Sequence, residues 1–187
     1  MSAQEGGQGL NTAGTGYGSL FDTNEFVLKK KIMSLREHYD IEDKLGNKIV
    51  GVDGNYLQVP TKFVVINSHD GSETMRIEGK MLSMHDQFSF KDPTGSEFAV
   101  IRKKIATLVH DQYWLEQNGK EVMRIYGDFM EHEYSMQANN QQVALVHKKW
   151  VSLADQYCIS ILADVDRRLV IGATIVIEHI EVTKRSH

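Results

Sequence analysis

Residues 169–177 read Leu-Val-Ile-Gly-Ala-Thr-Ile-Val-Ile, and this stretch decides the fold. It is apolar at every position rather than along one stripe, as expected for a segment that is surrounded on all sides. Its β-branched residues favour a strand, and periodicity alone leaves helix and strand open. We expect a buried helix with Asp164 or Asp166 as its N-cap. The side chains expected to plug the fold are Leu169, Val170, Ile171, Ile175, Val176 and Ile177.

The chain before this stretch repeats itself about every two dozen residues. Turn signals such as Asp70-Gly71 and Asn118-Gly119 recur at intervals of about 21 to 26 residues. The likeness extends to side chains, because Met75-Arg-Ile-Glu-Gly79 recurs as Met123-Arg-Ile-Tyr-Gly127. Each turn is preceded by an aromatic residue, and these six are Tyr39, Phe63, Phe88, Tyr113, Tyr134 and Tyr157.

Each repeat unit is predicted to be a β-hairpin. Apolar and polar residues alternate with a period of two, as in residues 134–137. Asn-Gly and Asp-Gly supply the positive φ angles that tight hairpin turns need. Five hairpins, with one strand before them at Glu25 to Met33 and one after them at Tyr157 to Leu162, give about twelve strands.

A meander of that many twisted strands, each with one apolar face, tends to curl until its edges meet. A barrel of that size is too wide for its own side chains to fill, so the apolar stretch is expected to occupy the lumen. We therefore predict a mainly β fold: a closed, roughly 12-stranded antiparallel barrel that encloses a hydrophobic C-terminal helix.

The composition indicates one globular domain behind a polar tail. The chain has 187 residues, of which 41% are hydrophobic and 25% charged, and its formal net charge of -4 gives no global attraction to nucleic acid. Residues 1–24 are dominated by glycine, serine, threonine and glutamine, so we expect a disordered tail before a single domain over residues 25–187.

The cysteine content and the hydropathy pattern favour the cytoplasm. Cys158 is the one cysteine, so neither a disulfide within the chain nor a cysteine-based zinc site is possible. No secretory signal pattern is present, and no apolar run reaches the roughly 20 residues of a membrane-spanning helix. We expect a cytoplasmic protein, in contact at most with a membrane surface.

The C-terminal segment and the first hairpin resemble a known family. Residues 164–178, Asp-Val-Asp-Arg-Arg-Leu-Val-Ile-Gly-Ala-Thr-Ile-Val-Ile-Glu, look like the Asp-x-Asp and apolar Ile-Gly-Ala helix at the end of phospholipid scramblases. Residues 39–50, Tyr-Asp-Ile-Glu-Asp-Lys-Leu-Gly-Asn-Lys-Ile-Val, are similar to the opening repeat of LURP-one-related proteins. The resemblance covers about residues 25–182 and implies the tubby C-terminal-like fold, a twelve-stranded barrel threaded by a hydrophobic helix.

The chain also departs from the relatives it resembles. Scramblases add a proline-rich N-terminus, a lipidated cysteine cluster and an acidic calcium loop, whereas this chain has two prolines, one cysteine and only Asp164 and Asp166 near that place. Palmitoylation and calcium gating are therefore not expected. Tubby-type domains bind phosphoinositide headgroups, but their basic ligands do not align with this sequence residue by residue.

No residue pattern indicates catalysis, a metal site or a cofactor. The His-Asp pairs at 85–86 and 110–111 begin repeat units at equivalent places, which is typical of barrel-end turns, and the same reading applies to residues 36–38 and 131–133. There is no Gly-x-Ser-x-Gly elbow, and Cys158 lies in a strand pattern typical of a buried, inert thiol. We expect the protein not to be an enzyme.

Three basic runs fall at the ends of strands away from the hairpin tips, so they should gather at one rim of the barrel. Such a rim would attract anionic headgroups, with about 1 kcal/mol from each basic residue near an acidic lipid surface. Acidic residues such as Asp111, Glu131 and Asp155 should share the rim, so a merely solvated collar of charges is the alternative. The candidate residues for an anion or headgroup site are Lys29, Lys30, Lys31, Arg102, Lys103, Lys104, Lys148 and Lys149.

The sequence thus favours a non-enzymatic binding or scaffold module of the LURP-one-related kind. Its expected partners are acidic phospholipids or unidentified proteins, and not nucleic acid. Two other functions stay open: a carrier of a small hydrophobic ligand in the barrel, and a phospholipid scramblase. We disfavour the scramblase because a helix buried in the barrel leaves nothing long enough to span a bilayer.

Overall fold

A computed structural model describes residues 20, 22–33, 36–55, 60–80, 87–106, 110–129, 131, 133–149 and 156–185. These residues form twelve strands followed by one helix. The strands are β1 (Glu25–Met33), β2 (Arg36–Asp43), β3 (Lys48–Asn55), β4 (Lys62–Asn67), β5 (Glu73–Lys80), β6 (Gln87–Lys91), β7 (Glu97–Ala106), β8 (His110–Gln117), β9 (Lys120–Asp128), β10 (Glu133–Ala138), β11 (Gln141–Lys149) and β12 (Gln156–Ile161), and the helix is α1 (Arg167–Arg185). Most of the predicted tail, residues 1–24, lies outside the described residues, but Leu20 is buried in the core.

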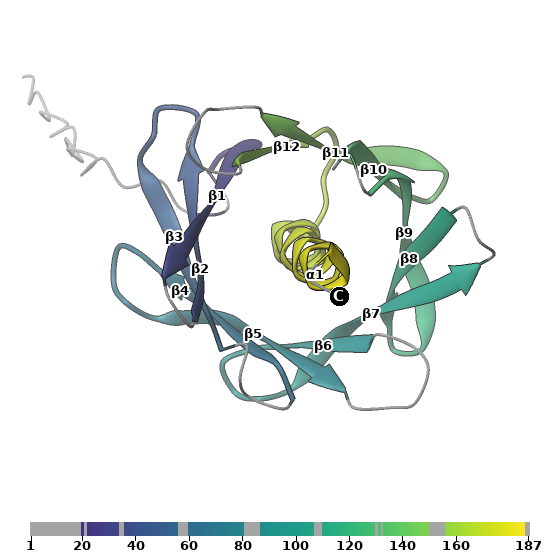
Figure 1. The fold of residues 1–187 in the computed structure, drawn as a ribbon, viewed down its shortest axis with the longest axis horizontal. Coiled ribbons are helices and arrows are strands. Elements are labelled where there is room, and N and C mark those ends of the chain that lie inside the picture. The colour runs from purple at the N-terminus through teal and green to yellow at the C-terminus, as the bar shows by residue number, and fades with distance from the viewer. Residues whose placement is uncertain are drawn as a thin grey trace, which may run out of the picture.

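The strands form one closed antiparallel barrel around α1 (Figure 1). Each strand pairs with the next one in sequence, and β1 closes the ring on β12 with Phe26 opposite Ile159. Closure leaves no strand edge unpaired, which removes the sites at which open sheets add further strands. The predicted barrel with an enclosed C-terminal helix is confirmed.

Alternate residues of each strand build the inner face of the barrel. In β12, Tyr157, Ile159 and Ile161 are buried while the residues between them are partly exposed. The hairpin turns have the predicted left-handed backbone, with φ of +73° at both Gly71 and Gly119. The period-two pattern therefore sets which side chains meet the helix and which face outward.

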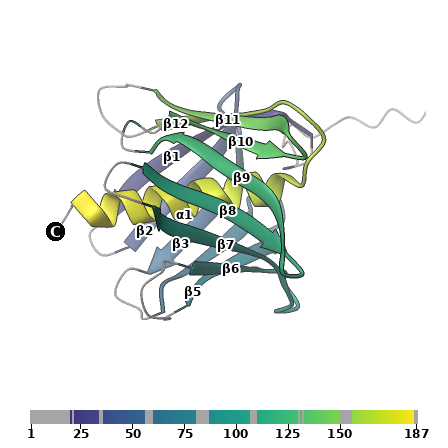
Figure 2. The same ribbon diagram turned by 90° about the vertical axis from the view of Figure 1, so that its right-hand side faces the viewer.

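Helix α1 fills the lumen along the barrel axis (Figure 2). Every residue from 169 to 181 is buried, including the six predicted plug residues, and a Cβ on Gly172 would lie only 2.7 Å from the Phe90 ring. The segment is helical rather than extended because the closed sheet offers it no hydrogen-bonding partner, so its backbone groups must bond to one another. Within the described residues, no helix combines the length and apolarity needed to cross a membrane.

The start of α1 is capped as predicted, but its end is later than predicted. The Asp166 side chain accepts a 3.0 Å hydrogen bond from the backbone N–H of Arg168, so Asp166 rather than Asp164 is the cap. The helix continues past Ile177 to Arg185. It does so because the charged residues that follow Ile177 find partners inside the barrel.

The barrel has two unlike ends. The hairpin turns lie at the end where the even-numbered strands finish and β12 leads into α1. At the other end, which we term the odd-strand rim, β1, β3, β5, β7, β9 and β11 finish. The antiparallel order therefore places the C-terminal half of α1 at the odd-strand rim, where its end emerges in Figure 2.

Candidate functional site

The eight basic residues of the predicted anion site lie near the odd-strand rim but on two faces of the barrel wall. Three of those that point outward are paired with acids. The pairs are Lys29 with Glu42, Lys31 with Asp40, and Arg102 with Glu116. Much of the positive charge on this part of the outer surface is therefore neutralised locally.

Lys30 and Lys103 do not belong to an outer rim at all. They are 9% and 2% exposed and point into the lumen, because the middle residue of a basic triplet on a strand faces the opposite side from its neighbours. Lys148 is half-buried, Lys149 is exposed, and the side chain of Lys104 lies outside the described part of the chain. Lys30 and Lys103 therefore do not take part in a solvated collar at the rim, and an anion site on the remaining basic residues stays a prediction.

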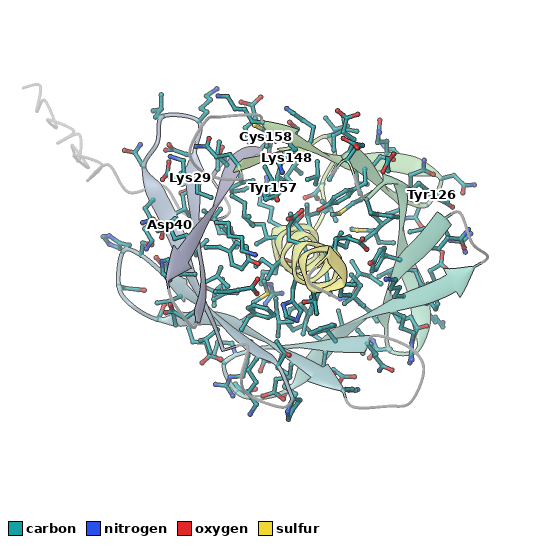
Figure 3. The ribbon with its side chains drawn as sticks, viewed as in Figure 1. Lys29, Asp40, Tyr126, Lys148, Tyr157 and Cys158 are labelled. Carbon is teal, nitrogen blue, oxygen red and sulfur yellow. The ribbon has the colours of Figure 1, made fainter. Side chains whose placement is uncertain are left out.

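The inward lysines each lie directly opposite one of the six repeat aromatics. The registers of three strand pairs place Lys30 opposite Tyr39, Lys103 opposite Tyr113 and Lys148 opposite Tyr157. The distances from Nζ to the ring centroid are 5.7, 5.5 and 6.0 Å, which is within cation–π range. Figure 3 shows Lys148 and Tyr157 on the lumenal side.

The other three repeat aromatics lie opposite glycines. The pairs are Gly54 with Phe63, Gly79 with Phe88, and Gly127 with Tyr134. A Cβ on Gly54 would lie 2.5 Å from the Phe63 ring, so the ring occupies the space of the missing side chain. These six pairs of adjacent strands thus use one arrangement in two versions, with a glycine or a lysine opposite an aromatic ring.

The C-terminal half of α1 brings acids to the buried lysines. Tyr113 donates a 2.8 Å hydrogen bond from its hydroxyl to Glu181 Oε1, and Lys103 Nζ lies 3.8 Å from the same oxygen. Burial, followed by the charge of Glu178, raises the pKa of Tyr134 well above its ordinary value. The Tyr134 hydroxyl therefore stays protonated beside Glu178 of the helix.

A second buried group joins α1 to β1 and β2. Glu37 accepts a 2.9 Å hydrogen bond from Lys30 through Oε1, and its Oε2 lies 3.1 Å from His179 Nδ1. The His179 ring packs edge-on against Phe63 and Phe88, with centroids 5.2 and 5.9 Å away. These contacts fix the depth and rotation of α1, because buried polar groups tolerate only positions in which they are paired.

Of the residues considered as metal ligands, those that the structure describes are not brought together. Glu37 faces the lumen, whereas His38 faces outward between Asp40, 3.0 Å from Nε2, and Asp53, 2.7 Å from Nδ1. Residues 85–86 and His132, and the side chains of His110 and Asp111, lie outside the described residues. Among the side chains that the structure describes, no group of three or more His, Cys, Asp or Glu is arranged to hold a metal ion.

Two residues of the outer wall are Cys158, whose surroundings differ from the sequence-based expectation, and Asp40. Cys158 is partly exposed on the outer face of β12, not buried, because its neighbours in the strand take the inward positions. At Asp40, burial acts to raise the pKa, but hydrogen bonds from two lysines and His38 outweigh it and lower the pKa to about 2. Asp40 is therefore an ionised anchor of the ion pairs on the β1–β3 wall.

A groove of about 440 Å³ opens on the outer wall over β9, β10 and β11. Tyr126, Ser135 and Leu145 lie side by side across it in register, and the small Ser135 leaves a trough between the two larger side chains. Tyr126 is 39% exposed and Leu145 37%, and Tyr126 lies on the outer surface in Figure 3. A second hollow of about 200 Å³ continues past Tyr126 toward the Asn139-Asn140 turn.

Sequence reasoning missed this groove, although one signal pointed to it. Tyr126 stands in the second Met-Arg-Ile copy where the first copy has Glu78, so an aromatic replaces a charge on the outer face. The exposure of Leu145 is harder to foresee. The ladder between β10 and β11 shifts register beside Val143, so Val143 and Leu145 face opposite sides despite being two residues apart.

The comparisons with known proteins agree with this architecture. The chain is 23% identical over 133 residues to the uncharacterised protein YxjI of Bacillus subtilis (strain 168), covering 60% of this chain and 82% of that protein. Its fold is similar to the X-ray structure of an Arabidopsis thaliana protein, with a TM-score of 0.59 at 13% identity, covering 83% of this chain and 91% of the other. The family model for LURP-one-related proteins matches residues 24–178. With most of its barrel and helix inside that match, the chain belongs to the LURP-one-related family.

Proposed function

We propose that the protein is a non-enzymatic binding module that engages a partner protein on the outer wall of the barrel, over β9, β10 and β11. The observation that carries this proposal is that the lumen is filled by α1, whereas the outer wall has an open groove. Residues 169–181 of α1 are buried inside, while the 440 Å³ groove is open to solvent. A volume of that size is in the ordinary range for binding pockets.

The chemistry of the groove supports binding rather than catalysis. Its walls are the apolar faces of Tyr126 and Leu145, and its floor is Ser135. Exposed apolar side chains that flank a hollow are typical of interaction surfaces, because an occupant removes their area from water. The barrel beneath is a rigid support, since its strands are paired on both sides.

An unbiased peptide display library tests the proposal. The wild-type protein should enrich a common set of peptides, and Ser135→Trp should not retain them because the indole fills the trough. Val64→Trp, on β4 in the opposite wall, is the matched control and should retain them. Absence of enrichment, or equal retention by Ser135→Trp, would contradict binding at this groove.

Contact with acidic phospholipids is a second candidate. It is supported by Lys149, which is exposed at the end of β11, and by Lys31, whose side chain is 55% exposed despite its pairing with Asp40. Each such residue near an anionic surface adds about 1 kcal/mol, so two residues give weak binding. Sedimentation with phosphatidylcholine vesicles, with and without phosphatidylserine, tests this: equal and negligible binding at low salt eliminates it, and Lys149→Glu should weaken any binding seen.

The other two functions that the sequence left open have less support. A hydrophobic ligand carried in the lumen would have to take the place of α1, whose residues 169–181 pack against the inner face. Scrambling by an inserted helix would require α1 to leave its buried partners, including the contacts of Glu181 and His179. Both functions therefore need a rearranged barrel, whereas outer-wall binding does not.

A further inference from the structure

We propose that the occupant of the groove is an extended peptide segment with a large apolar side chain and a basic side chain two residues away. This inference rests on the proposed function and adds the chemistry of the partner. The apolar side chain would lie over Ser135, between Tyr126 and Leu145, and the basic one beside Glu133. Glu133 is two residues from Ser135 on the same face of β10.

The shape of the groove favours an extended chain over a helix. The two hollows follow β10, whose six residues span about 20 Å at the usual strand rise. The side walls rise from β9 and β11, which are two strand spacings apart, roughly 10 Å. A helix with its side chains is about 10–12 Å wide and would not enter between those walls, whereas a single extended chain would.

The charges around the groove favour a basic partner. Glu133 lies directly opposite Asp128 in the ladder, and the Asp128 carboxylate accepts a 3.0 Å hydrogen bond from the backbone N–H of Glu131. Glu131 is exposed next to them. At the far end of the trough the positive charge of Arg124 is taken up by Glu121, which accepts two 2.7 Å hydrogen bonds. A cationic side chain at Glu133 would therefore be attracted by three neighbouring carboxylates, those of Glu133, Asp128 and Glu131.

The closed sheet limits the strength of this binding. All strands are paired on both sides, so the peptide has no edge with which to form a backbone ladder. Binding must come from the apolar contact and the charges, and we expect a Kd of about 10–1000 µM. The charge contribution should weaken as salt is raised.

The test uses the full chain and a synthetic heptapeptide with phenylalanine at its centre and lysine two positions to either side, the rest being glycine and serine. The symmetric sequence presents the same pattern in either chain direction. Amide chemical shifts in an NMR titration should move around residues 126, 135 and 145. Tyr126→Ser and Leu145→Ser should each raise the Kd about tenfold, while Leu45→Ser, at an exposed site on the β2–β3 turn, should leave it unchanged.

Charge reversal tests the basic partner separately. Glu133→Lys should raise the Kd for the lysine peptide about tenfold and allow the peptide with glutamate in place of lysine to bind. Asp53→Lys, on the far wall, is the control and should change neither affinity. Thermal unfolding of each variant, and the milder Glu133→Gln, separate loss of binding from loss of fold.

The outcomes distinguish the inference from the proposed function. If the lysine and glutamate peptides bind equally, or if neither binds, the basic partner is wrong. If the display library still yields peptides that depend on an open Ser135 trough, the proposed function survives that result. If the library also yields none, both fail together.

Discussion

The strand pair β5–β6 and the strand pair β9–β10 carry the two copies of the Met-Arg-Ile motif, and they agree on the inside of the barrel. Each sets a glycine opposite an aromatic ring, Gly79 with Phe88 and Gly127 with Tyr134. Each buries the methionine and isoleucine of its Met-Arg-Ile motif. The inner face has little freedom, because every side chain there must fit against α1 and its neighbours in the ring.

The same two copies differ on the outside. In the first, Lys91 donates a 2.5 Å hydrogen bond to Glu78, and Ser89 beneath them is only 1% exposed. In the second, Tyr126 replaces the glutamate and Ser135 forms the floor of an open groove. The inner face is therefore fixed by packing against the helix, whereas residues on the outer face can differ between copies without changing the fold.

The largest loss of stability is expected from replacing the glycine that lies opposite an aromatic ring in the second copy. Gly127 has a φ of +149°, and a Cβ there would lie 2.2 Å from the Glu133 carbonyl oxygen. Gly127→Ala should therefore cost at least about 3 kcal/mol of unfolding free energy, or prevent folding. In Gly79→Ala the Cβ meets the Phe88 ring at 3.3 Å and the Thr61 carbonyl oxygen at 3.5 Å, so a loss of about 1 kcal/mol is expected.

Urea denaturation measures both losses. Equal losses for the two variants would contradict the expectation that Gly127→Ala is the more destabilising, which rests on the positive φ and the close backbone contact at Gly127.

In β7 and β8, a lysine rather than a glycine lies opposite the aromatic ring, Lys103 opposite Tyr113. Lys103→Met leaves Glu181 buried beside Tyr113 without its ammonium partner, so we expect a loss of about 2–4 kcal/mol. Adding Glu181→Gln removes the buried charge and should recover at least half of that loss. Lys31→Met, on the outer face, should change the unfolding free energy by less than about 0.5 kcal/mol. A double variant no more stable than Lys103→Met would show that the two side chains are not coupled.

Exchanging the outer residues of the two copies should have smaller and unequal effects. Glu78→Tyr removes the pairs with Lys91 and Lys62, so we expect a loss of about 1 kcal/mol. Tyr126→Glu in the other copy removes partly exposed apolar surface and one long, exposed 3.5 Å hydrogen bond from Arg124, so it should stay within about 0.5 kcal/mol while abolishing peptide binding. If Tyr126→Glu proves the more damaging to stability, Tyr126 supports the fold rather than a partner.

The smallest expected effect is a difference in acid sensitivity. The hydrogen bond from Lys91 lowers the pKa of Glu78 below its ordinary value of 4.5. A lowered carboxyl pKa in the folded state adds stability that is fully present above pH 4.5 and is lost as the pH falls through the folded pKa. Glu78→Gln should therefore lose less stability than the wild type between pH 6 and pH 3, as measured by urea midpoints. Identical slopes would mean that the pair contributes nothing.

The inner face of the barrel could be predicted from the sequence, whereas the binding groove on its outer face could not. Repeated turns, period-two alternation and an apolar final segment follow from hydrogen bonding and burial, which act in the same way in every hairpin. The inward direction of Lys30 and Lys103 follows from the same alternation, but the acids that compensate their burial come from β2 and from α1, beyond the end predicted for that helix. Local charge patterns carry no information on such distant partners.

The groove was missed for a related reason. It depends on three strands, and on a register shift beside Val143 that turns Leu145 outward. Neither feature has a marker within one strand. The replacement of Glu78 by Tyr126 between copies is visible in the sequence, but it becomes informative only when the register places Ser135 beside it.

The central claim is that α1 stays inside the barrel while partners bind to the outer wall. Amide hydrogen exchange of α1 tests it most directly. The buried backbone should exchange only through global unfolding, so the amides of residues 171–181 should be among the slowest in the protein. With a saturating peptide ligand their protection should rise by the factor 1 + L/Kd, where L is the free peptide concentration, as for every amide that exchanges through global unfolding. Rapid exchange of these amides while the strands stay protected would contradict the account, because it would mean that α1 leaves the barrel and opens the lumen to a ligand.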